Sequence, residues 1–279
     1  MVFKEPPPDA GWMVDPLEIR CTKCIGCRLD HSDQWRNRIS HESMMHPSSY
    51  FVTLTYNPEH LPMGGNLIKS DVQKFVRSLR RRGQDIRYFA AGEYGDKYQR
   101  PHYHLIVFNL ELSDLKKLPI PTKWTLYSSE WLSQSWDKGF VSVGYVTEQS
   151  ASYVARYCVK KVTGPKAEEH YTRVDPRTNE EYQVIPEFSL MSKKPPIGAT
   201  WYQAYGFQTH RDDYIIFNGS RQKVPRAYDA ILKKSCQDSY DWIKEKRKTA
   251  ALAAPPVNLA AIEVTVKKRL ELLKRTLED

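Results

Sequence analysis

Arg100-Pro-His-Tyr-His-Leu-Ile-Val-Phe108 is the stretch that decides the fold of this 279-residue chain. From His102 onward it is rich in aromatic and branched side chains, as β-strands are. Residues two apart on a strand point the same way, so His102 and His104 project together, while Tyr103, Leu105 and Val107 face the other side. Two imidazoles on one face can hold one divalent cation, although a His-x-His pair alone is a short coincidence.

A third ligand precedes this strand. Arg87 to Gly92 reads as another strand, and Glu93 lies at its end, nine residues before His102. If the two strands pair as an antiparallel hairpin, the Glu93 carboxylate can reach the histidine face. Two histidines and one carboxylate leave positions open for a phosphate oxygen and water, and this ligand set suits Mn²⁺ and tolerates Mg²⁺. The alternative is that Glu93 is a solvated hairpin charge.

Other elements are predicted on both sides of this hairpin. The patterns indicate a surface helix (about 28–46), a strand (51–56), a helix (70–82), a strand (140–146), a helix (148–161) and a hairpin (214–219). The last segment is helical, broken at 253–257, with a final helix from about 258 to 277. Strands and helices in this order predict an α+β fold.

The helix predicted at 148–161 carries a pair of tyrosines. At about 100° per residue, Tyr153, Tyr157 and Lys160 fall within about 60° of one another, and the apolar residues fall on the other side. This pattern predicts that both phenols lie on the face away from the core. A phenol with a pKa near 10 attacks a phosphodiester only with help, which a lysine or a metal-polarised phosphate supplies. Plain packing is the alternative for such a pair.

Three of the five cysteines lie close together near the N-terminus. Cys21, Cys24 and Cys27 with His31 have the spacing of a structural zinc site of three thiolates and one imidazole. Reduced thiols without a metal are the other interpretation. The spacing also recurs in iron–sulfur motifs, but no fourth cysteine lies nearby.

The composition narrows the class of protein. Lysine and arginine number 42 against 33 acidic residues, a net charge of +9, so the surface should attract polyanions such as nucleic acid. No Gly-x4-Gly-Lys-Ser/Thr loop occurs, so nothing supports a helicase or another ATPase domain. The N-terminal residues lack an apolar leader segment, and no apolar stretch approaches membrane-spanning length, which predicts a soluble, cytosolic protein.

The ordered motifs resemble those of a known superfamily. The chain is similar to rolling-circle replication initiators of the His-hydrophobe-His endonuclease superfamily, and more closely to the replication initiation proteins of gokushovirus-type microviruses. The resemblance covers about residues 20 to 165 and rests on Cys24-Ile-Gly-Cys-Arg28, Phe51-Val-Thr-Leu-Thr-Tyr56, Arg100–Phe108 and Tyr153-Val-Ala-Arg-Tyr-Cys-Val-Lys-Lys161. The middle residue of the metal motif, Tyr103, is less apolar than the superfamily's name suggests.

This resemblance implies a central antiparallel sheet of about five strands, with the histidine strand central and the tyrosine helix beside it. It implies metal ligation by His102, His104 and Glu93. Tyr157 with Lys160 matches the Tyr-x-x-Lys pattern of single-tyrosine initiators and would act first, and Tyr153 would act in a second transfer. The reaction would nick single-stranded origin DNA, leaving a 5′-phosphotyrosine and a free 3′-hydroxyl, and later rejoin the ends.

The expected partners follow from this reaction. They are single-stranded DNA at a replication origin and the helicase and polymerase of the host, in the cytoplasm of a bacterium. The residues expected to contact DNA are Thr53, Thr55, Arg100, Lys161, Lys193 and Lys194. The alternatives are a plasmid relaxase or transposase of the same superfamily, and a non-catalytic zinc-containing DNA-binding protein.

We expect four regions along the chain. They are an N-terminal segment with the cysteines and a helix (1–47), the endonuclease core (48–165), a basic insertion or accessory strands (166–235) and a helical C-terminal tail (236–279).

Overall fold

The computed structural model describes residues 21–22, 24–95, 98–119, 125–162, 164–175, 177–255 and 258–272, without the side chains of 157–160, 259 and 269–272. The helices in this part are α1 (Ile25–Ser43), α2 (Lys69–Arg81), α3 (Glu130–Trp136), α4 (Glu148–Lys160), α5 (Lys166–Tyr171), α6 (Ala199–Asp212), α7 (Arg226–Ser235), α8 (Gln237–Ala253) and α9 (Leu259–Leu272). A 3₁₀ turn covers Met63–Gly65. None of these helices is long and apolar enough to cross a membrane.

A seven-stranded sheet with the order β4-β5-β6-β1-β3-β2-β9 forms the centre, and its recorded strand pairs are antiparallel. The strands are β1 (Ser49–Tyr56), β2 (Arg87–Tyr94), β3 (Pro101–Phe108), β4 (Lys116–Lys117), β5 (Tyr127–Ser128), β6 (Gly139–Tyr145) and β9 (Phe188–Met191). The histidine strand β3 is the middle one of the five strands from β6 to β9. This arrangement confirms the predicted α+β fold and the central place of β3.

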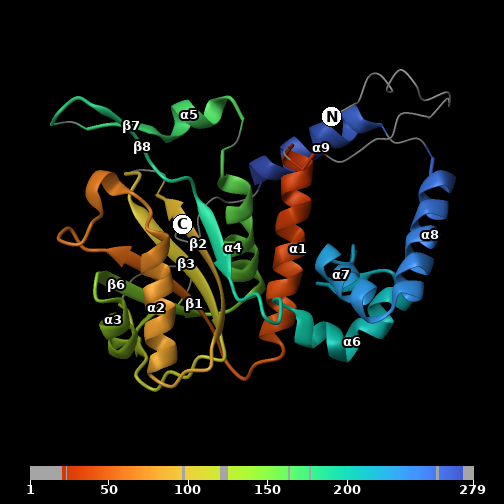
Figure 1. The fold of residues 1–279 in the computed structure, drawn as a ribbon, viewed down its shortest axis with the longest axis horizontal. Helices are drawn as coiled ribbons and strands as arrows, with labels where there is room; N and C mark the ends of the chain where they lie inside the picture. The colour runs from red at the N-terminus through yellow and green to blue at the C-terminus, as the bar shows by residue number, and fades with distance from the viewer. Residues whose placement is uncertain are drawn as a thin grey trace.

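Helices cover both faces of this sheet (Figure 1). On one face, α2 and α3 pack over the alternate residues of β3, including Tyr103, Leu105 and Val107. On the other face, α4 packs over Ile106 and Phe108, and α1 lies along the outer side of α4. Strand alternation therefore separates two apolar cores and leaves the start of β3 to carry the histidines.

Helix α1 is more buried than a surface helix. The prediction of a surface helix is wrong here because α1 lies between α4 and α6. Ile39 and Glu42 are both fully buried. The Glu42 carboxylate pairs with Arg87 of β2 and accepts a hydrogen bond from the Gly198 amide at 2.6 Å. These partners satisfy the charge that a buried carboxylate carries.

Two small hairpins lie outside the sheet. One is formed by β7 (Thr172–Val174) and β8 (Glu181–Gln183) and the other by β10 (Ile215–Phe217) and β11 (Ser220–Gln222). The second confirms the hairpin predicted from Asn218-Gly219. Gly219 has a φ of +69°, the left-handed conformation that glycine adopts without steric cost.

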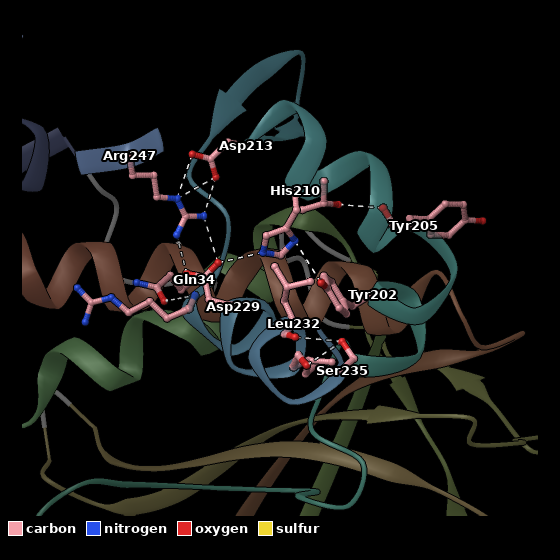
Figure 2. Close-up of polar contacts among 12 residues, drawn as sticks. Gln34, Tyr202, Tyr205, His210, Asp213, Asp229, Leu232, Ser235 and Arg247 are labelled. Carbon is pink, nitrogen blue, oxygen red and sulfur yellow. Dashed lines mark hydrogen bonds and ion pairs between the residues drawn. The ribbon is translucent and has the colours of Figure 1, made fainter. Parts of the chain in front are cut away.

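A polar network ties the C-terminal helices together (Figure 2). Arg247 of α8 pairs with Asp213 at 2.6 Å and with Asp229 of α7 at 2.9 Å. His210 of α6 contacts the same Asp229 carboxylate at 3.0 Å and the Tyr202 hydroxyl at 3.2 Å. These contacts join α6, α7 and α8 through side chains from three separate segments.

Candidate metal centre and tyrosine helix

The strand register brings the three predicted ligands together. His102 of β3 pairs directly with Glu93 of β2, and His104 pairs with Thr53 of β1. Residues directly opposite each other in a sheet share a face, so Glu93, His102, His104 and Thr53 all project towards the α4 side. The predicted antiparallel hairpin is thus confirmed, and the sheet itself positions the site.

The ligand atoms converge within this face. Glu93 Oε2 lies 3.5 Å from His102 Nε2 and 3.4 Å from His104 Nε2. The potential ligand atoms of the three residues all lie within 4.8 Å of one another. Glu93 and His104 are buried, and the His102 side chain is 18% exposed. One divalent cation between these atoms would meet two imidazole nitrogens and one carboxylate oxygen, with access from the His102 side.

Each imidazole is oriented through its other nitrogen. His102 Nδ1 lies 3.1 Å from the Arg100 carbonyl oxygen, an acceptor that requires the proton on Nδ1 and leaves Nε2 as a lone pair. His104 Nδ1 contacts Thr53 Oγ1 at 3.1 Å. Such partners fix the ring orientation of metal-binding histidines. The donor set therefore fits a divalent metal ion.

The electrostatics favour an ionised carboxylate. Burial would raise the pKa of Glu93, but hydrogen bonds from His102 and His104 and their charges outweigh it, so its pKa is well below the ordinary range. Glu93 therefore offers an anionic oxygen at neutral pH.

Tyr153 lies against this centre, contrary to the predicted face. Its side chain is only 6% exposed and belongs to the core between α4 and the sheet. The ring packs edge-on against His104, with centroids 5.2 Å apart, and also against Phe51. The prediction of a face away from the core is wrong because α4 has α1 on one side and the sheet on the other. Both sides of the helix are therefore covered.

The second tyrosine lies one turn further along α4. The side chains of Tyr157 and Lys160 lie outside the described residues. Only Val146 and Thr147 separate α4 from β6, so α4 runs back along the sheet, in the direction of β1. Four residues advance a helix by about 6 Å. The backbone at Tyr157 is thus further along towards the end of β3 that carries His102.

The residues expected at DNA differ in their surroundings. Thr53 and Thr55 are partly exposed on the histidine face. The Arg100 guanidinium donates to the Tyr56 carbonyl at 2.6 Å, so this side chain also holds the β1 and β3 ends together. The exposed residues Lys161, Lys193 and Lys194 follow α4 and β9.

Sequence reasoning missed one aromatic residue on this face. Phe140 of β6 pairs with Thr55, which in turn pairs with His102, so all three share the face of the metal centre. The Phe140 side chain is 69% exposed. With two strand spacings between them, Phe140 and His102 are separated by roughly 10 Å. Alternation within 140–146 could have signalled it, because Phe140 faces the side opposite Val141 and Val143.

The N-terminal cysteines also converge, without the predicted histidine. The sulfur atoms of Cys21, Cys24 and Cys27 lie within 4.8 Å of one another, and His31 is not part of this group. Trp35, one turn further along α1, donates to His31 Nε2 at 3.1 Å, which explains why the ring points elsewhere. The Cys27 amide lowers the pKa of Cys24, but the neighbouring thiols and burial raise it, with a net increase.

Comparisons with known proteins agree with this geometry. The family model for replication-associated protein ORF2 matches residues 49–162. Replication-associated protein ORF2 of Spiroplasma virus 4 is 38% identical over 250 residues, covering 84% of this chain and 74% of the relative. Replication-associated protein VP4 of Bdellovibrio phage phiMH2K is 36% identical over 247 residues, with the same coverage. No solved structure matches the chain.

Proposed function

Since this chain belongs to the family of microvirus replication-associated proteins, we propose that it nicks single-stranded origin DNA and so begins rolling-circle replication. The observation that carries the proposal is the convergence of Glu93, His102 and His104 beneath the tyrosine helix. A tyrosine oxygen forms a bond to phosphorus, and the bond from phosphorus to the 3′ oxygen breaks. The phenol loses a proton and the 3′ oxygen gains one, giving a 5′-phosphotyrosine and a free 3′-hydroxyl. Reversal rejoins the ends.

Glu93, His102 and His104 would hold Mn²⁺ or Mg²⁺. When bound, the cation supplies a positive charge that orients the scissile phosphate and stabilises its transition state. The chain's own contribution is preorganisation. The Arg100 carbonyl and Thr53 hydroxyl keep the two imidazoles aimed at Glu93. The sheet register then keeps the three ligands together without a flexible loop between them.

The two tyrosines would divide the two transfers. Tyr157 is the proposed first nucleophile, with Lys160 stabilising its phenolate. Tyr153 would act in the second transfer, when the regenerated origin is cut while the first tyrosine is still esterified. The contact of Tyr153 with His104 supports this assignment, because it brings a phenol beside a proposed metal ligand.

The DNA strand would enter along the exposed end of this face. Phe140 would stack on a base, and Thr53 and Thr55 would line the path. Arg100, Lys161, Lys193 and Lys194 would contact phosphates. The free 3′-hydroxyl would prime a host polymerase, and a host helicase would unwind the circle in the bacterial cytoplasm. The phages named among the relatives support a bacterial host.

A covalent adduct assay tests the chemistry. The full chain is incubated with Mn²⁺ and single-stranded oligonucleotides that tile the genome encoding it, and adducts are separated on a denaturing gel. We expect an adduct that disappears with EDTA and with His102→Ala, and in the Tyr153→Phe/Tyr157→Phe double variant. Tyr145→Phe is the matched control, because Tyr145 is exposed at the far end of β6. Cleavage that persists in the double variant would contradict the tyrosine assignment, and DNA binding without an adduct would favour a non-catalytic DNA-binding protein.

A binding measurement tests the proposed path of the strand. Phe140→Ala should weaken binding of a single-stranded oligonucleotide by at least about fivefold, since stacking of one base contributes about 1–3 kcal/mol. Phe207→Ala, which removes another exposed aromatic ring from α6, should leave the affinity unchanged. Equal effects of the two variants, measured by fluorescence anisotropy, would remove Phe140 from the path.

A further inference from the structure

The cysteine cluster (Cys21, Cys24 and Cys27) is a second group of metal-binding side chains. Its three sulfur atoms lie within 4.8 Å of one another, and all three side chains are thiols. Cys24 caps the N-terminus of α1, and Cys27 lies in its first turn. Partial positive charge at a helix N-terminus favours thiolates over thiols. The cluster therefore combines close sulfur atoms with a local field that supports their ligand form.

The turn before α1 brings Cys21 to the other two. Thr22 has a φ of +58°, a conformation that is rare for a β-branched residue. With this turn, the Cys24 amide donates a hydrogen bond to Cys21 Sγ at 3.2 Å. Hydrogen bonds to the sulfur help to orient and tune a thiolate that binds a metal. The backbone is thus arranged around the sulfur atoms and not around a capping side chain.

We propose that Cys21, Cys24 and Cys27 bind one thiophilic divalent ion, zinc in the cell, through three thiolates. Each thiol loses its proton as its sulfur–metal bond forms, and water completes a tetrahedron. Sulfur atoms on one zinc ion lie roughly 4 Å apart, given zinc–sulfur bonds of about 2.3 Å. The observed spread of at most 4.8 Å agrees with one ion. An iron–sulfur cluster places its thiolates on different iron atoms, and therefore further apart.

The position of the ion gives it a structural consequence. The next residue, Arg28, donates from its guanidinium to the Lys161 carbonyl at 2.6 Å, and α1 packs along α4. An ion that fixes the first turn of α1 would therefore also fix the end of α4. That part of the inference rests on the proposed function, because the end of α4 carries the tyrosine motif. Ion binding itself does not depend on it.

Cobalt substitution distinguishes the two metal-binding groups. Titration of the full chain with Co²⁺ should give an intense near-ultraviolet band from thiolate-to-cobalt charge transfer, complete at a single equivalent. The band should be lost in Cys24→Ser/Cys27→Ser and retained in Cys236→Ser, a matched change at an exposed cysteine before α8. It should also be retained in His102→Ala/His104→Ala, because those ligands are nitrogen atoms. A wild-type chain without the band would overturn the proposal.

Two further measurements use the same preparations. Elemental analysis of chelator-free protein should find zinc, and finding iron with inorganic sulfide would overturn the single-ion site. The cobalt spectrum of His31→Ala should equal that of the wild type, and a changed spectrum would overturn the ligand set of three thiolates. If the cobalt band forms but no variant or condition gives a DNA adduct, the proposed function fails while the ion site stands. Adduct without the cobalt band is the reverse case.

Discussion

The sheet and the C-terminal helices each bring histidines and carboxylates together, but with different charge arrangements. In the sheet, one carboxylate faces two imidazoles, and the positive charge it meets there is that of the rings. In the C-terminal helices, Arg247 lies between Asp213 and Asp229 and supplies the cation from the protein itself (Figure 2). Residue types alone therefore do not distinguish a metal centre from a structural ion-pair network. The presence of a built-in guanidinium does.

Both carboxylates are held ionised, for different reasons. Burial raises the pKa of Asp229, but hydrogen bonds with His210 and Arg247 and their charges lower it overall. The pKa of Glu93 is lowered by its two histidines. A metal ion in the sheet would add the charge that Arg247 already provides in the helices. The comparison predicts that changes in the sheet affect metal binding and catalysis, and that changes in the helices affect stability.

Replacing one histidine in each cluster should have the largest and most different effects. His104→Gln should cost more Mn²⁺ affinity than the roughly 10- to 100-fold that loss of an outer partner costs, because a ligand itself is removed. The DNA adduct should be lost with it. His210→Gln should leave both properties unchanged and lower only the melting temperature. Calorimetric Mn²⁺ titration and the adduct gel measure the pair, and equal Mn²⁺ affinities for both variants would refute the distinction.

Removing the guanidinium tests the helical cluster. Arg247→Ala leaves two carboxylates facing each other and should lower the free energy of unfolding by about 2 kcal/mol. This is less than the 3–5 kcal/mol typical of a buried pair, since the Arg247 side chain is 35% exposed. Lys248→Ala, which removes a surface pair with Glu245, should change the stability by less than about 0.5 kcal/mol. Urea denaturation compares the two, and equal midpoints would make the network irrelevant to stability.

The hydroxyl behind His104 should have a smaller effect in the sheet. Thr53→Val keeps the shape of the side chain but removes the contact with His104 Nδ1, so Mn²⁺ should bind about tenfold more weakly. Ser142→Ala is the control, because Ser142 lies opposite Thr53 on the same face. Electron paramagnetic resonance of free Mn²⁺ gives both affinities. Unchanged affinity in Thr53→Val would show that the hydroxyl does not orient the ring.

The sequence predicted those features that depend on local repeats. Alternation along residues 102–108 set the two faces of β3, and the spacing from Glu93 to His102 set the hairpin register. Burial of Tyr153 did not follow from the helical pattern, because the pattern does not reveal that α1 covers the other side of α4. His210, Asp229 and Arg247 belong to separate helices, so no local period connects them. Likewise, β9 joins β2 across a long sequence separation, which adds an unpredicted strand to the sheet.

The pH dependence of stability should show the smallest difference between the clusters. A carboxylate whose pKa is lowered by folding stabilises the protein above its ordinary value, 3.8 for Asp229, and this stabilisation is lost as the pH falls through the lower folded value. Between pH 7 and pH 3 the wild type should therefore lose more stability than Asp229→Asn, by up to about 1 kcal/mol. Asp241→Asn, an exposed carboxylate on α8, should behave like the wild type. Parallel curves for Asp229→Asn and wild type, from urea denaturation at each pH, would mean that Asp229 keeps the same proton affinity in the unfolded chain, and the ion pairs of Figure 2 would then add no pH-dependent stability.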